Sequence, residues 1–191
     1  MSEALYLSDP EGNGIEFYAD RPRALWRWSD GPDGRRQVDM TNSPLDAEGL
    51  LREGSGTPWT GAPDGTRIGH VHLRVGDVAE AARFYGGGVL GMEVMRAGPG
   101  AVFLSTGGYH HHLAANAWRS AGAGPRDSRR AGLAWVTFEA ADRESLAGIA
   151  RRGAAEGTED LAGDGLRDPW GTALRFRVAA RPVPVSDPTE G

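Results

Sequence analysis

Histidine is the residue type whose spacing first suggests chemistry in this sequence. All five histidines fall in two short segments, His70-Val71-His72 and His110-His111-His112. Imidazole is the commonest metal ligand in proteins, and it titrates nearest to neutral pH. Five such groups in two segments indicate a pocket that binds a metal, binds an oxyanion or moves a proton.

Both histidine segments are predicted to lie on strands. Residues 68–75 alternate, which places the two histidines on one face and the apolar residues on the other. The triple histidine is predicted to open a strand that ends near Trp118, with His110 and His112 on one face and His111 on the other. We therefore expect one cup to be lined by His70, His72, His110, His112 and Asn116.

Two interpretations of this cup remain open from the residues alone. In one, the imidazoles ligate a metal or hydrogen-bond an oxyanion, and Tyr109 donates a proton to the bound group. In the other, the histidines are core and rim residues paired with backbone or water, and Tyr109 is packing. The tryptophans Trp26, Trp28 and Trp118 are interpreted as packing residues.

The composition limits the function classes. The chain has 191 residues, a formal charge of −5 and no cysteine, which excludes thiol catalysis, disulfides and iron–sulfur clusters. A mildly acidic chain does not have the basic footprint of nucleic-acid binding. We see no leader and no long apolar run, so we expect a cytoplasmic protein without membrane or nucleic-acid partners.

The order of elements predicts an α+β protein built from repeated units. A strand, a helix and three further strands are expected over 67–118 and again over 132–178. The turns Asp9-Pro10-Glu11-Gly12 and Asp168-Pro169-Trp170-Gly171 each lead into an outgoing strand. The first hairpin therefore looks like the end of a third unit whose front is missing. The predicted segments are a hairpin over 1–20, a connection over 21–66, the paired domain over 67–180 and a disordered tail over 181–191.

Several of these motifs, taken in order, resemble one family. They are Ile68-Gly69-His70-Val71-His72-Leu73-Arg74-Val75, Phe84-Tyr85 with Val89-Leu90-Gly91-Met92, and the two Asp-Pro-x-Gly turns. They are similar to the vicinal-oxygen-chelate superfamily of glyoxalases, bleomycin-resistance proteins and extradiol dioxygenases. Residues 2–16, together with Tyr109 and the triple histidine, resemble its catechol-2,3-dioxygenase-like branch.

The resemblance implies a fold and a metal. Its fold pairs β-α-β-β-β units into an incomplete barrel with a divalent metal in the cup. In ring-cleaving members two histidines and one glutamate hold the metal, a set suited to Fe(II) and dioxygen. In those members the glutamate follows an Asp-Pro-x-Gly turn, and Glu16 holds that position after the first such turn of this chain. After the second turn, the same position holds Arg175. Trp135 lies in the strand where the resemblance leads one to expect a histidine.

The resemblance also implies roles. The expected metal ligands are His70, His110, His112 and Glu16, with Fe(II) as the metal and Mn(II) or Zn(II) as alternatives. His112 and Tyr109 are the expected catalytic residues, and His72 and Asn116 the expected substrate contacts. The implied function is extradiol cleavage of a catechol-type aromatic by a homodimer. The alternatives are a protein of the resistance type that binds an aromatic or chelating ligand without turnover, and a degenerate scaffold.

Overall fold

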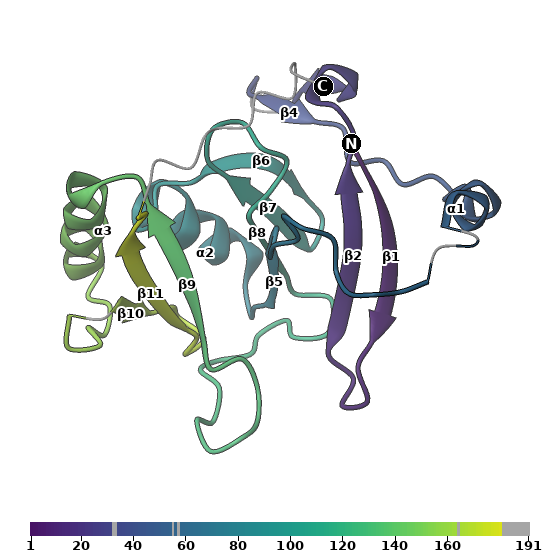
Figure 1. Cartoon of the computed structure of the whole chain (residues 1–191). Helices are drawn as coiled ribbons and strands as arrows, with labels where there is room; N and C mark the ends of the chain where they lie inside the picture. The colour runs from purple at the N-terminus through teal and green to yellow at the C-terminus, as the bar shows by residue number, and fades with distance from the viewer. Residues whose placement is uncertain (32–33, 55, 57, 164, 181–191) are drawn as a thin grey trace. The chain divides into compact units, whose positions relative to one another are not determined.

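The computed structural model describes residues 1–31, 34–54, 56, 58–163 and 165–180 (Figure 1). The described residues divide into two units, one ending at Gly69 and the next beginning at His70. Each unit is described by itself. Within the described residues, every helix is too short or too polar to cross a membrane.

The first unit opens with the predicted hairpin. Strands β1 (Ser2–Ser8) and β2 (Gly14–Asp20) pair antiparallel and form a two-stranded sheet. In the turn, Asp9 Oδ1 accepts hydrogen bonds from the backbone N–H groups of Glu11 (2.9 Å) and Asn13 (2.7 Å). Gly12 has φ +83°, a conformation that favours glycine.

The remainder of the first unit consists of short elements. A 3₁₀ turn (Arg23–Leu25) precedes β3 (Trp28–Asp30), which pairs antiparallel with β4 (Arg36–Val38). Helix α1 (Ala47–Gly54) follows within the segment that the sequence predicted as a connection. The Asp46 carboxylate accepts from the Gly49 N–H at 2.9 Å, so Asp46 caps the helix.

The second unit begins with the predicted strand–helix–three-strand order. Its first sheet has the order β5-β8-β7-β6, formed by β5 (Val71–Arg74), β6 (Glu93–Gly98), β7 (Ala101–Ser105) and β8 (Leu113–Asn116). Strands β5 and β8 are parallel, and the other pairs are antiparallel. Helix α2 (Val78–Arg83) is capped by Asp77 and continues as one π-helical turn over Phe84–Gly88.

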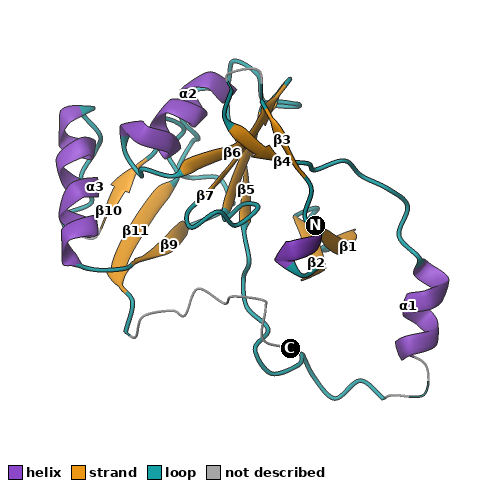
Figure 2. Ribbon diagram, turned by 90° about the horizontal axis from the view of Figure 1, so that it is seen from above, coloured by secondary structure: helices purple, strands orange, loops and turns teal. Residues whose placement is uncertain are grey.

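The second sheet of this unit has the order β10-β11-β9. Strand β9 (Trp135–Ala140) pairs parallel with β11 (Ala173–Val178), which pairs antiparallel with β10 (Gly165–Arg167). Helix α3 (Arg143–Ala155) lies alongside this sheet (Figure 2). The sequence predicted three strands after α3, but the described residues there form two strands and one isolated bridge, Asp160 to Leu166.

One apolar core connects the two sheets of the second unit. It includes Leu73 and Val75 from the β5 segment, as the alternation predicted, and Leu166 and Leu174 from the second sheet. The α+β class is confirmed, and the strands of the described residues form separate sheets without closing into a barrel.

Candidate functional site

The first sheet of the second unit brings the two histidine segments together. His70 immediately precedes β5 and His72 lies within it, while His110–His112 immediately precede β8. Because β5 and β8 are parallel neighbours, His72 lies opposite Ala114. The predicted grouping of the histidines in one region is therefore what the structure has.

The predicted strand at the triple histidine is wrong in its start and its faces. Strand β8 begins only at Leu113, so the three histidines lie in the connection from β7 and the strand alternation does not apply to them. His110 and His111 are both buried, at 1% and 7% exposure. His110 and His112 therefore do not share a strand face with His111 on the opposite side.

Two imidazoles of this connection, His110 and His111, lie against each other and against His70, with their ring planes tilted. The ring of His111 lies 4.2 Å from that of His70 and 4.6 Å from that of His110, measured between centroids. The edge of Phe103 meets His111 at 5.2 Å. The Nδ1 atoms of His110 and His111 are 2.7 Å apart, so one of them donates a proton and the other accepts it.

Burial, followed by the charges of the neighbouring His70 and His110, lowers the pKa of His111 from 6.5 to about 2. A buried imidazole loses the solvation of its charged form, and nearby imidazoles oppose a second positive charge. His111 is thus neutral across the physiological pH range.

His72 and Asn116 form a second pair on the same sheet. Asn116 Oδ1 accepts from the Trp118 N–H at 3.3 Å, so the amide nitrogen of Asn116 faces Nε2 of His72 at 2.7 Å. An amide nitrogen donates, which assigns the proton of neutral His72 to Nδ1. The centre of the His72 ring lies 5.8 Å from that of Trp118 and 6.2 Å from that of Phe103. These three rings form an aromatic wall.

His112 has different neighbours. Its Nδ1 lies 3.0 Å from Ser105 Oγ and accepts from the Thr106 N–H at 3.4 Å. The ring of Tyr109 stacks on it at 4.8 Å with an interplanar angle of 23°. Tyr109 also contacts the ring of His110 at 4.0 Å, so the tyrosine is held between two imidazoles.

Sequence reasoning missed Ser105, Thr106 and Phe103. The signal lay in the register of the β7–β8 pair, where Leu104 is opposite Leu113. One step outward along both strands, that register places Ser105 beside His112. Alternation within single strands does not show such a cross-strand neighbour.

Glu16 belongs to the first unit. It lies on β2, opposite Tyr6 of β1, and its carboxylate accepts a hydrogen bond of 2.7 Å from the Tyr6 hydroxyl. Desolvation, followed by this hydrogen bond and the charge of Glu16, raises the pKa of Tyr6 to about 12. The carboxylate therefore has a local partner within its own hairpin.

The described residues do not fit the metal that the family resemblance implies. Within them, no three histidine, cysteine, aspartate or glutamate side chains are arranged to hold a metal ion. In this region the Nδ1 atoms of His110 and His111 hydrogen-bond to each other, and Nε2 of His72 accepts from Asn116. A ligand set of two histidines and one carboxylate needs lone pairs that converge on one point.

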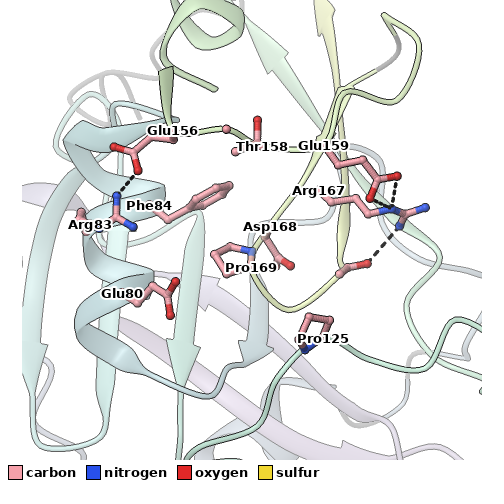
Figure 3. Close-up of a pocket in the computed structure, with 12 residues that line it drawn as sticks. Glu80, Arg83, Phe84, Pro125, Glu156, Thr158, Glu159, Arg167, Asp168 and Pro169 are labelled. Carbon is pink, nitrogen blue, oxygen red and sulfur yellow. Dashed lines mark hydrogen bonds and ion pairs between the residues drawn. The ribbon is translucent and has the colours of Figure 1, made fainter. Parts of the chain in front are cut away.

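A cleft of about 300 Å³ opens elsewhere in the second unit (Figure 3). Its walls carry the ion pair Arg83–Glu156 and the contact of Arg167 Nε with the Glu159 carboxylate at 3.3 Å. It shares no residue with the predicted site. Because Arg83 pairs with Glu156 and Arg167 with Glu159, neither arginine of the cleft is unpaired, and the cleft does not replace the histidine region as the candidate site.

Next to this cleft, a buried hydrogen bond ties the second Asp-Pro turn to α2. Tyr85, which is fully buried, donates to Asp168 Oδ2 at 2.5 Å. Asp168 Oδ1 accepts from the backbone N–H groups of Trp170 (2.9 Å) and Thr172 (2.7 Å). Burial and the Asp168 carboxylate raise the pKa of Tyr85 well above its usual value, so it remains protonated.

Comparison with known proteins agrees with the motifs. The model of the Glyoxalase/Bleomycin resistance protein/Dioxygenase superfamily matches residues 67–176. A protein of Bacillus subtilis (strain 168) named "Catechol-2,3-dioxygenase" is 45% identical over 154 residues, which are 80% of this chain and 52% of that protein. This chain thus spans about half the length of that relative.

Solved structures show weaker likeness. A glyoxylase/bleomycin resistance protein/dioxygenase domain from Frankia sp. EAN1pec has a TM-score of 0.47 and 22% identity, covering 60% of this chain and 98% of that one. A lactoylglutathione lyase from Agrobacterium tumefaciens has a TM-score of 0.44 and 19% identity, covering 60% and 93%. With more than half of its residues matched by the family model, the chain belongs to the Glyoxalase/Bleomycin resistance protein/Dioxygenase superfamily.

Proposed function

We propose that this protein is a dioxygenase-like member of the superfamily that acts on a small aromatic compound of the catechol type. The observation that carries the proposal is the 45% identity to the Bacillus subtilis protein of that name. A match of 154 residues in a chain of 191 necessarily includes the central residues, and these hold all five histidines. Because the chain spans about half of that relative, the activity of the whole relative is a proposal here.

The side chains of the second unit support a role in ligand contact. Phe103, His72 and Trp118 form an aromatic wall beside Asn116, a surface suited to a flat aromatic ring. His112 and Tyr109 lie together at the start of β8 and supply polar groups for ring oxygens. His111, whose pKa is lowered to about 2, stays neutral and brings no positive charge to this region at neutral pH.

A divalent metal bound by two histidines and one carboxylate would need a ligand in addition to the histidines of the second unit. Glu16 remains the candidate carboxylate, on the hairpin of the first unit. Fe(II), Mn(II) and Zn(II) stay predictions, as do homodimer formation and a cytoplasmic location.

Oxygen uptake tests the proposal directly. Purified protein is incubated with Fe(II) under argon, then supplied with air-saturated buffer and catechol, and dissolved oxygen is recorded. We expect catechol-dependent uptake that falls at least tenfold in His112→Gln and in Glu16→Gln. Glu11→Gln, an exposed carboxylate of the same hairpin, serves as the matched control and should leave uptake unchanged.

A second function, binding of an aromatic ligand without turnover, is favoured by the absence of a three-residue metal group within the described residues. Quenching of tryptophan fluorescence by catechol, with Trp118→Phe as the control for the reporter, measures binding. Saturable quenching with no oxygen uptake after loading with Fe(II), Mn(II) or Zn(II) would replace the first proposal with the second.

A further inference from the structure

The backbone holds His112 firmly between two strands. Its N–H donates to the Leu104 carbonyl at 2.9 Å, and its carbonyl accepts from the Val71 N–H at 3.1 Å. The imidazole therefore starts from a fixed Cα position beside the end of β7. Ser105, the last residue of β7, is fully buried, and its hydroxyl lies 3.0 Å from Nδ1 of His112.

A backbone amide decides which nitrogen of His112 carries the proton. The Thr106 N–H points at Nδ1 over 3.4 Å, and a backbone N–H can only donate. Nδ1 must then be an acceptor, which leaves the proton of the neutral ring on Nε2. The Ser105 hydroxyl can also donate to Nδ1, so two donors converge on one lone pair.

The opposite arrangement is less favourable. In it, Nδ1–H would donate to Ser105 Oγ, and the serine hydroxyl would donate to the Thr106 carbonyl at 3.2 Å. The hydrogens on Nδ1 and on the Thr106 nitrogen would then face each other. The Thr106 N–H would also lose His112 as its acceptor.

We infer that Ser105 and the Thr106 amide fix His112 as the Nε2–H tautomer. In this tautomer Nε2 of His112 is a hydrogen-bond donor and does not serve as a metal ligand. A metal binds the lone pair of a neutral imidazole, and in this tautomer that lone pair is already accepting hydrogen bonds. The group that His112 suits is an acceptor oxygen, such as a phenolate or carbonyl oxygen of an aromatic ligand. Ser105 is thus a positioning residue, and the ligand role of His112, though not its tautomer, rests on the proposed function.

Nitrogen NMR of histidine tests the tautomer without any turnover. Protein labelled with ¹⁵N-histidine is freed of metal, and two-bond ¹H–¹⁵N correlations are recorded near neutral pH. His112 is assigned by the signals that disappear in His112→Gln. We expect a protonated Nε2 and an unprotonated Nδ1, and a protonated Nδ1 would overturn the inference.

Two substitutions test the part played by Ser105. Ser105→Ala should shift the His112 nitrogen signals toward an average of the two tautomers, and Ser105→Thr should restore the wild-type pattern. Unchanged signals in Ser105→Ala would remove Ser105 from the inference. Should the alanine variant fail to fold, the wild-type spectrum still decides between the tautomers.

Metal titration provides an independent arm. Zn(II) alone is added to wild type and to His112→Gln, and its affinity is measured by competition with a chelating dye. We expect the two affinities to agree within about twofold, since loss of even a supporting group of a metal site typically costs 10–100-fold. A loss of tenfold or more in the variant would show that His112 is a ligand. Neither result depends on catechol turnover, so failure of the proposed function leaves both readouts intact.

Discussion

Acid is expected to destabilise the second unit through His111. In the folded chain, burial, with His70 and His110 beside it, lowers the pKa of His111 to about 2. In the unfolded chain the same imidazole has a pKa near 6.5. Below pH 6.5 the unfolded state therefore takes up a proton that the folded state refuses, and protonation favours unfolding.

The sign and size follow from proton linkage. The contribution of His111 is complete above pH 6.5 and is lost progressively as the pH falls toward about 2. Each pH unit in that window removes about 1.4 kcal/mol, so at pH 5 the free energy of unfolding is lower by about 2 kcal/mol than at pH 8.

Urea unfolding of metal-free protein at a series of pH values measures this effect. Tryptophan fluorescence reports on the second unit because Trp170 is buried in its core. His111→Gln should be less stable at every pH but should lack this share of the slope between pH 7 and pH 5. Parallel curves for wild type and His111→Gln would refute the assignment of a neutral buried His111.

Two further substitutions test the turn that closes the second sheet. Tyr85→Phe leaves the buried Asp168 carboxylate without its side-chain donor and should lower the free energy of unfolding in urea by about 1–3 kcal/mol. The control Tyr6→Phe removes the exposed hydrogen bond to Glu16 and should lower it by less than about 1 kcal/mol. Equal losses in the two variants would contradict the argument from burial. Gly165 has φ +150°, and a Cβ there would lie 1.9 Å from the Leu174 carbonyl oxygen, so Gly165→Ala should break the β10–β11 pairing and speed amide exchange at Leu166; unchanged exchange would show that the backbone relaxes.

Local patterns predicted the parts of the fold that local physics determines. The Asp9 and Asp168 turns were matched by sequence alone, and they make the same bonds: in each, Oδ1 accepts from the second and fourth following N–H groups. Such a turn is closed by its own residues, so short spacing suffices. The caps Asp77 and Asp142 are local in the same way, since each accepts from the N–H three residues further along the chain.

The triple histidine shows where such prediction stops. Alternation assumes an extended chain, but residues 110–112 lie in a connection where their rings contact Tyr109 and Phe103. Phe103 lies on the neighbouring strand β7, so a single-strand pattern contains no information on its contact with His111. The hydrogen bonds that distinguish His112 from His110 likewise depend on the register of β7 against β8.

The two matching turns also locate the chemical difference between the two hairpins. Counting from each aspartate, Leu7 and Ile15 correspond to Leu166 and Leu174, yet the first pair is 46% and 38% exposed and the second 5% and 0%. In the second sheet, α3 and β9 cover these positions.

The same count places Arg175 where the first hairpin has Glu16. The Arg175 guanidinium lies 4.2 Å from the centre of the Trp135 ring, a cation–π contact that holds a positive charge on this face. A fixed guanidinium repels a divalent cation and attracts an anion. The second hairpin is therefore chemically unsuited to supply a carboxylate to a metal site at this position, and the difference follows from the single exchange of Glu16 for Arg175 between two turns that are otherwise alike.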